Sequence, residues 1–356
     1  MTALTRPVRP AEDNARLRPV PWRRMAGITW RQHRFALAGV AVLLGALTVW
    51  LWIQGTSVHH TWDAVTACRP AGSPDCQDLA ATFNGTWSGM GNAAILLQLL
   101  PALIGAFVGA PVLARELETG TFRFAWTQGF GRWRWALAKL VALAVVLAAA
   151  TAAFGALVSW CFQPYSAADN QALGIYGNSP LVTVPGLREV TFPAWTLAAF
   201  AIGALAGMLI RRVVPAIVAT LAIYAGLAIA AAAFLREHYL APLATSSPNV
   251  PGTAWTLGQW WTKGGRFAFA GNPPTSLLNQ YCTFPQSPGG KGGGGGPSSS
   301  ANPFAQCLAP HGYTMWTSYQ PASRFWPFQW IEGGWLLALA VLLIVATIWL
   351  VCHRAA

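Results

Sequence analysis

The sequence predicts an all-α polytopic membrane protein with six transmembrane helices, and three observations support that fold class. Six apolar stretches of roughly 20 residues divide the chain, and this is the length that a helix needs to cross a bilayer. Only 10% of the 356 residues are charged, whereas a soluble domain carries about 25%. In the segments between these stretches, the excess of basic residues lies on one side of the membrane, as it does in membrane proteins. The polar segments add an N-terminal interfacial helix, one long inward loop between helices 2 and 3, and a large outward segment between helices 5 and 6.

The predicted spans are rich in Ala, Gly and Leu, and such small residues allow helices to approach closely. None has an Asp, Glu, Lys or Arg in its interior, where ionisable residues usually mark ion-coupled carriers. This argues against a carrier driven by protons or sodium. Pro101 and Pro215 lie inside spans, where we expect a packing role and keep a gating hinge as the alternative. The spans are 35–53, 93–113, 140–162, 193–210, 213–235 and 334–352.

The fourth and fifth spans are separated by little more than Arg211 and Arg212. Taken together they contain about 40 apolar residues, twice what one crossing needs, so two spans are predicted rather than one. The two arginines would form the turn of a tight helical hairpin on the inner side of the membrane.

The basic residues favour one side of the membrane. If the N-terminus faces the cytoplasm, the inward segments carry 16 of the 23 Lys and Arg residues and 4 of the 11 Asp and Glu residues, hence the whole formal charge of +12. This pattern predicts a multi-pass protein of the cell (plasma) membrane with cytoplasmic N- and C-termini. The bases flank apolar spans, so we expect them to contact membrane lipid and not nucleic acid.

The first 34 residues divide into two parts. Residues 1–21 contain four prolines and scattered arginines, which predicts a disordered cytoplasmic tail. Residues 22–34 read WRRMAGITWRQHR, with Arg24, Arg31 and Arg34 at helical spacing. This is typical of a short basic helix that lies on the inner membrane surface. This polar segment is longer than the polar start of a secretory signal, so the first span should not be removed and should remain as a membrane anchor. Residues 35–235 contain this span and the four that follow it, helices 1 to 5.

The outward segment 236–333 is long enough to fold as an extracellular cap. Its Gly-rich insertion, residues 287–300, is expected to have no fixed structure. Residues 334–356 then form the sixth span and a short cytoplasmic tail.

Four of the six cysteines form two local pairs in outward loops. Cys68 and Cys76 share the first such loop, and Cys282 and Cys307 share the last. An oxidising exterior would convert each pair into a disulfide, whereas the alternative is partly buried free thiols.

The only inward loop long enough to fold covers residues 114–139, ARELETGTFRFAWTQGFGRWRWALAK. Glu116 and Glu118 are the only acidic residues in any inward loop between spans. Phe122 and Trp126 are four residues apart and would share one face of a short amphipathic helix. Such a helix, held parallel to the membrane, can dock into a groove of a soluble partner. The alternative is a plain interfacial loop that is basic because it faces the cytoplasm.

The sequence contains no visible catalytic apparatus. It has no G-x-x-x-x-G-K-[ST] phosphate loop and no H-E-x-x-H motif. The adjacent His59 and His60 have no neighbouring cysteine or carboxylate pair, so we predict no metal site. We therefore expect no enzymatic activity from this chain.

Two stretches resemble the permease (transmembrane) subunit of ABC transporters of the type-2 exporter class, in particular small actinobacterial permeases. Thr29-Trp30-Arg31-Gln32-His33-Arg34 resembles the elbow helix that opens these permeases. Arg115-Glu116-Leu117-Glu118-Thr119-Gly120-Thr121 is similar to their R-E-x-E-x-G-T segment between spans two and three, and Gly131-Arg132-Trp133-Arg134-Trp135 follows it. The layout agrees as well, although the Gly-rich insertion departs from compact members.

The resemblance implies the permease subunit of an ATP-driven exporter that forms its translocation path as a dimer, either a homodimer or a paired permease. A separate cytoplasmic ABC ATPase subunit would bind ATP and Mg, and this chain would bind no cofactor. The elbow helix would contain Trp30, Arg31, His33 and Arg34. The cytoplasmic coupling region that meets the ATPase would contain Glu116, Glu118, Thr119, Gly120, Thr121, Phe122, Arg123 and Trp126.

Two other function classes stay open at this point. A non-transport scaffold or sensor would act through its extracellular cap and would need no ATPase. An intramembrane enzyme or a secondary carrier would need polar groups at membrane depth, where the predicted spans offer only uncharged side chains such as Gln98, Thr151 and Tyr224.

Overall fold

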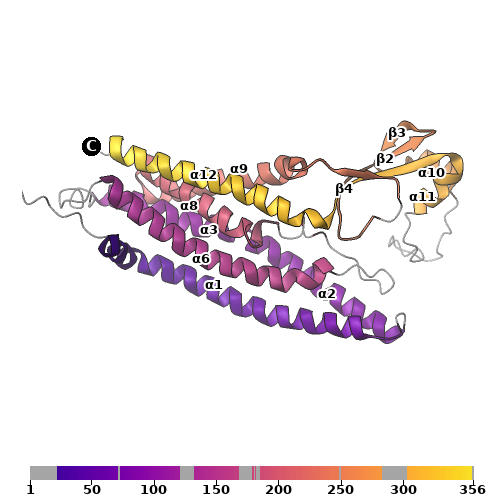
Figure 1. Ribbon diagram of the computed structural model, residues 1–356, viewed down its shortest axis with the longest axis horizontal. Helices are drawn as coiled ribbons and strands as arrows, with labels where there is room; N and C mark the ends of the chain where they lie inside the picture. The colour runs from indigo at the N-terminus through magenta and orange to yellow at the C-terminus, as the bar shows by residue number, and fades with distance from the viewer. Residues whose placement is uncertain are drawn as a thin grey trace, which may run out of the picture.

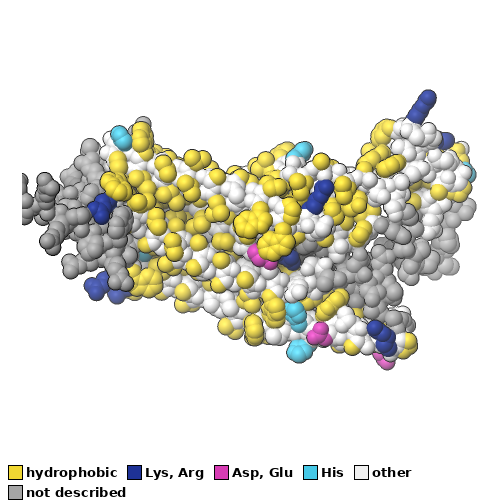
Figure 2. Space-filling view, in the orientation of Figure 1, with side chains coloured by type: hydrophobic (Ala, Val, Ile, Leu, Met, Phe, Trp, Pro, Cys, Tyr) yellow, Lys and Arg dark blue, Asp and Glu magenta, His cyan; other side chains and the backbone are white. Residues whose placement is uncertain are grey.

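The computed structural model describes residues 22–70, 73–120, 132–167, 179, 181, 185–247, 250–282 and 303–354. Six helical segments are long and apolar enough to cross a membrane, so the predicted number of spans is confirmed. They run side by side along the long axis of the molecule, and their visible face is mostly hydrophobic (Figures 1 and 2). The segments are Thr29–Ala67, Pro74–Thr119, Trp133–Ser166, Thr191–Ile210, Val213–His238 and Ala322–His353. The predicted tail 1–21 and the Gly-rich insertion 287–300 lie outside the described residues.

The predicted elbow and the first span belong to one continuous helix. α1 (Trp22–Ala67) contains both, and its first turns bend away from the axis of the rest (Figure 1). Because all residues of the segment keep helical hydrogen bonding, the elbow is a bend within α1 and not a separate element. The end of α12 (Phe325–Arg354) lies at the same end of the bundle as the start of α1 (Figure 1).

α1 and α2 (Pro74–Leu97) extend far past the spans that we predicted. At 1.5 Å per residue, the 46 residues of α1 cover about 70 Å, more than twice the roughly 30 Å of the hydrocarbon layer. The hairpin therefore projects beyond the end of α6 (Arg132–Ala167), as Figure 1 shows, and a disulfide between Cys68 and Cys76 closes it. We ended the first span at residue 53 because polar residues begin there, but a helix can leave the bilayer without ending.

The second span consists of several helical pieces. α2 ends at a turn formed by Gln98 and Leu99, and α3 (Leu100–Ile104), the π-helix η1 (Gly105–Gly109) and α4 (Ala110–Thr119) follow. Pro101 lies in the first turn of α3, where its missing N–H leaves no gap in the hydrogen-bond ladder. The chain thus turns just before Pro101, at Gln98 and Leu99, and not at the proline itself.

α8 (Thr191–Ile210) occupies the centre of the bundle and packs against α12, α4, α6 and the helix that follows it. Its glycines allow the backbones to touch. A Cβ added at Gly203 would lie 2.8 Å from the backbone nitrogen of Ala110, and one at Gly207 would lie 2.4 Å from the Ala110 carbonyl oxygen. Small residues serve this purpose at membrane helix interfaces. α8 and α4 therefore form a close interface that larger side chains would disrupt.

α8 and α9 (Val213–Ala230) form the predicted tight hairpin. Arg211 has a left-handed backbone (φ 59°) and Arg212 is extended, so two residues reverse the chain. Pro215 lies in the first turn of α9, where a proline does not bend a helix. The position gives no support to a hinge there. α9 continues as η4 (Ala231–Leu235) and η5 (Arg236–His238).

The cap contains a four-stranded antiparallel sheet, which the sequence analysis did not predict. The strands are β1 (Leu243–Thr245), β2 (Trp255–Lys263), β3 (Arg266–Ala270) and β4 (Tyr313–Gln320), in the order β1-β4-β2-β3. β2 and β3 are joined at Gly264 and Gly265, which both have positive φ, as a tight hairpin turn requires. The sheet lies at the end of the molecule away from the chain termini (Figure 1).

A small hydrophobic core stabilises the cap. Trp261 is fully buried in it, together with Leu308 and Met315. The short helices α10 (Thr275–Tyr281) and α11 (Pro303–Leu308) cover this core, and the disulfide between Cys282 and Cys307 joins their ends. η7 (Ala322–Arg324) then leads into α12. The cap is thus a folded unit with its own core.

Candidate functional site

The inner end of α4 carries the acidic pair that we assigned to the coupling region. Gly120 ends the helix in a left-handed conformation (φ 72°), which glycine adopts without strain. The Thr119 hydroxyl donates to the Arg115 carbonyl at 2.8 Å. The described chain stops at Gly120 and resumes at Arg132. Thr121, Phe122, Arg123 and Trp126 lie outside the described residues.

Glu116 forms an ion pair with Lys139 near the start of α6. Both side chains are shielded from solvent, with 15% of Glu116 and 2% of Lys139 exposed. The Lys139 ammonium also lies 5.1 Å from the centre of the Trp135 ring. A charge this deeply buried needs its partner, because an isolated ammonium in a low-dielectric interior is strongly unfavourable. The ion pair therefore joins the two helices that flank residues 121–131.

Glu118 joins the same end of α4 to a third helix. Its Oε2 accepts the backbone N–H of Val213 at 3.2 Å, at the first residue of α9. A carboxylate at this position satisfies a free helical N–H and interacts favourably with the helix dipole. The two glutamates thus connect α4 to α6 and to α9, and both contacts are internal to the chain.

The predicted elbow residues take different positions. Trp30, Arg31 and Arg34 are exposed, whereas His33 is partly buried and close enough to Lys139 to experience its charge. Among the described residues, no group forms a hydrogen bond with His33 Nε2. The inner cluster, defined as His33, Glu116, Glu118 and Lys139, therefore brings together α1, α4, α6 and α9.

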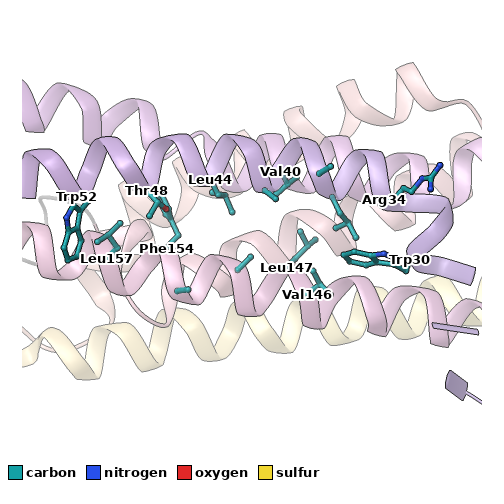
Figure 3. A pocket seen from close by; sticks show the side chains of 16 residues that line it. Trp30, Arg34, Val40, Leu44, Thr48, Trp52, Val146, Leu147, Phe154 and Leu157 are labelled. Carbon is teal, nitrogen blue, oxygen red and sulfur yellow. The ribbon is translucent and has the colours of Figure 1, made fainter. Parts of the chain in front are cut away.

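α1 packs against α6, and an apolar groove of about 600 Å³ lies between them. Figure 3 shows Leu44 and Phe154 pointing into it, with Trp30 near one end and Trp52 near the other. The two tryptophans are 22 positions apart in α1, which corresponds to about 33 Å of helix, close to the thickness of the hydrocarbon layer. Tryptophan favours the membrane interface. The groove therefore matches the apolar depth of a bilayer.

A second charged cluster, which the sequence analysis missed, lies at the cap end of the bundle. Glu332 on α12 is 3% exposed and accepts two hydrogen bonds from Arg236, at 2.7 and 2.8 Å. The Trp195 indole N–H donates to the same carboxylate at 2.8 Å. Next to it, the Trp335 indole N–H donates to the Tyr239 hydroxyl at 3.0 Å. This outer network connects α8, η5 and α12.

Three charged residues of these clusters were not predicted as site residues, for the same reason. Lys139 precedes our third span by one residue, Arg236 follows our fifth by one residue, and Glu332 precedes our sixth by two. We had assigned all three to loops, but the helices continue past them. The signal available in the sequence was the position of these charged residues directly next to an apolar stretch, where the helix can continue.

The remaining candidate groups have structural partners. The pairs Cys68–Cys76 and Cys282–Cys307 are disulfide-bonded. His59 forms a hydrogen bond with the Trp160 carbonyl at 3.0 Å and stacks on the Trp160 ring. Within the described part of the chain, no three His, Cys, Asp or Glu side chains are grouped as metal ligands would be.

The sequence matches the family described as "ABC-2 membrane transporter related" over residues 41–236. The match begins within the first span, ends within the fifth and covers more than half of the chain. No curated protein and no solved structure matches it. The resemblance to type-2 ABC permeases, which we drew from two short motifs, is confirmed at the level of the family. The chain is a multi-pass membrane protein that belongs to the ABC-2 membrane transporter related family.

Proposed function

We propose that this protein is the permease subunit of an ATP-driven exporter and that residues 114–131 receive the force from a separate ATPase subunit. The observation that carries the proposal is the inner cluster. Glu116 and Glu118 connect the start of that segment to α6 and to α9, by an ion pair and a hydrogen bond to the first N–H of the helix. A push on the segment is thereby distributed to several spans.

The packing beyond the inner cluster supports transmission across the membrane. α4 touches α8 backbone to backbone at Gly203 and Gly207, so a displacement of α4 moves α8 with it. At the cap end, Glu332 and Arg236 connect α12, η5 and, through Trp195, α8. The spans would tilt as connected groups between inward-open and outward-open states.

The path and the orientation are parts of the same proposal. Two copies, or this chain and a second permease, would line the path at their interface. The N- and C-termini and residues 114–131 would face the cytoplasm at the cell membrane, and the cap would be extracellular. The concentration of basic charge in those segments supports this orientation. The apolar groove between α1 and α6 would suit membrane lipid or an apolar cargo.

The experiment is co-expression with an ABC ATPase subunit, followed by co-purification in mild detergent and by ATP hydrolysis in proteoliposomes. Trp126→Asp and Phe122→Asp should weaken association, because they remove the predicted apolar anchors. Glu116→Gln should preserve association but reduce transport per ATP hydrolysed, because it removes the ion pair with Lys139 that joins α4 to α6. The matched control Glu237→Gln, at an exposed carboxylate of η5, should change neither.

Absence of any ATPase association with the wild-type chain, when both proteins are well expressed, would contradict the permease proposal. In that case the folded cap would favour a scaffold or sensor instead, since Trp261, Leu308 and Met315 form a core independent of the spans. Ligand binding to the cap without an ATPase would then be the expected finding.

A further inference from the structure

A second cavity lies at the cap end of the bundle, between α6, the residues just before α8, and the start of α12. Its volume is about 530 Å³, within the range of small-molecule sites. Its lining includes both a cationic and an anionic side chain as well as aromatic rings, whereas the lining of the groove between α1 and α6 is mostly apolar. We call it the outer pocket. The residues used below are Ser159, Trp160, Arg188, Glu189, Phe325 and Trp326.

The outer pocket gathers polar atoms without partners. Four buried side-chain polar atoms of the described residues have no hydrogen-bond partner, and three of them belong to residues lining this pocket. They are Ser159 Oγ, Arg188 Nε and Glu189 Oε2. Buried polar groups in native proteins are nearly always paired, so such a concentration calls for a missing partner. A ligand in the pocket would supply it.

Arg188 is held rigidly at this position. Its carbonyl accepts the N–H groups of Thr191 and Phe192 at 3.0 and 3.2 Å, which fixes it to the first turn of α8. Only 5% of the residue is exposed, and its guanidinium lies 5.5 Å from the centre of the Phe325 ring. Burial lowers the pKa of Arg188 to about 10, so the side chain remains a cation at neutral pH. It forms no salt bridge with any described residue.

Glu189 presents the opposite charge next to it. Its backbone is in the left-handed region (φ 24°), which non-glycine residues adopt at an energetic cost. Such strain tends to persist where a ligand or a functional site uses the geometry. The pocket therefore offers a cation and an anion side by side, with Trp160 and Trp326 beside them.

We propose that the outer pocket binds a zwitterion in which a phosphate or carboxylate is joined to a protonated amine. Arg188 receives the anionic group, as guanidinium groups do. Glu189 Oε2 and Ser159 Oγ accept hydrogen bonds from the ammonium N–H groups, and the aromatic rings pack on its carbon chain. Trp326 is half exposed at the start of α12, and tryptophan is enriched at membrane interfaces. The headgroup of phosphatidylethanolamine and free phosphoethanolamine share this chemistry. The inference is independent of coupling to an ATPase.

The test measures dissociation constants by native mass spectrometry of the full chain in detergent. The probes are phosphatidylethanolamine, phosphatidylcholine, phosphatidylglycerol and free phosphoethanolamine. Phosphatidylethanolamine should bind at least about tenfold more tightly than phosphatidylcholine, whose quaternary ammonium has no N–H to donate. Equal binding of these two lipids would overturn the proposal. Tight binding of free phosphoethanolamine would identify a soluble occupant, whereas binding of the lipid alone would identify a headgroup.

Variants of the two charges give a second, independent reading. Arg188→Gln should weaken binding of phosphatidylethanolamine about tenfold or more, and Arg188→Lys should retain part of it. The wild-type pocket should prefer phosphatidylethanolamine to phosphatidylglycerol. Glu189→Gln should reverse this preference, so that phosphatidylglycerol binds more tightly than phosphatidylethanolamine. The matched controls Arg266→Gln and Glu237→Gln, both exposed and outside the pocket, should leave binding unchanged. Should Arg188→Gln fail to fold, an unchanged lipid preference in Glu189→Gln would still refute the proposal.

Discussion

Replacing Gly207 by alanine should force α8 and α4 apart. The new Cβ would lie 2.4 Å from the Ala110 carbonyl oxygen, and real Cβ atoms essentially never approach closer than 3.0 Å. One backbone must therefore move by about 0.6 Å or more, and overpacking of this kind costs about 1–3 kcal/mol. Gly226→Ala is the matched control, because no atom lies within 4 Å of its added Cβ. In a helix that control should gain about 0.5–1 kcal/mol.

The free energy of unfolding can be measured for both variants by SDS titration in mixed micelles, with helix content as the signal. Both positions lie within helices, so the gain in helix propensity is common to the two variants, and the expected difference between Gly207→Ala and Gly226→Ala is the overpacking cost of about 1–3 kcal/mol. The extent to which a thiol reagent labels the buried Cys161 during heating gives a second measure of which variant is more stable. Equal stability of the two variants would show that α8 and α4 do not touch as described, and would remove the basis for transmission from α4 to α8.

Further predictions address the outer network, the cap and the insertion. Glu332→Gln should lower the free energy of unfolding by about 3–5 kcal/mol, because it leaves a buried arginine unpaired, whereas Glu237→Gln should stay within about 0.5 kcal/mol. A smaller loss in Glu332→Gln would mean that water reaches this pair. Cys282 and Cys307 should resist a thiol reagent until a reductant is added, and labelling without reductant would exclude their disulfide. Deletion of residues 289–296 should leave membrane expression unchanged, and a loss of membrane expression would show that the glycine run has a packing role.

The transmembrane part of the fold could be predicted from local sequence because each span is a long apolar run. The Arg211–Arg212 turn was also predictable, since the apolar run around it is twice the length of one crossing. The break in the second span was not predicted. Pro101 marked its neighbourhood, but the turn at Gln98 and Leu99 depends on how α3 packs against α8.

The cap sheet had a signal in the sequence that we did not use. Residues 255–270 contain two runs rich in aromatic and β-branched residues around Gly264 and Gly265, which is a hairpin pattern. Over its first five residues β4 alternates buried residues with exposed or partly buried ones, as a half-buried strand does. Its pairing with β1, however, joins segments about 70 residues apart and could not be read from local pattern.

The candidate site could be predicted only in part. The motif resemblance drew attention to Glu116 and Glu118, and their place in the coupling region stays a prediction. Their partners within the chain, Lys139 and the N–H of Val213, are 23 and 95 residues away in sequence, so only tertiary structure reveals them. The outer pocket likewise depends on three separate segments and carries no sequence motif.

Site-specific photo-crosslinking tests the central claim, that residues 114–131 receive the ATPase subunit. A photoreactive phenylalanine analogue would replace Trp126 in cells that co-express the ATPase candidate, and a second sample would carry it at Phe267, an exposed position on β3 of the cap. We predict a covalent adduct with the ATPase from position 126 and none from position 267. An ATPase adduct from neither position, or equally from both, would contradict the account.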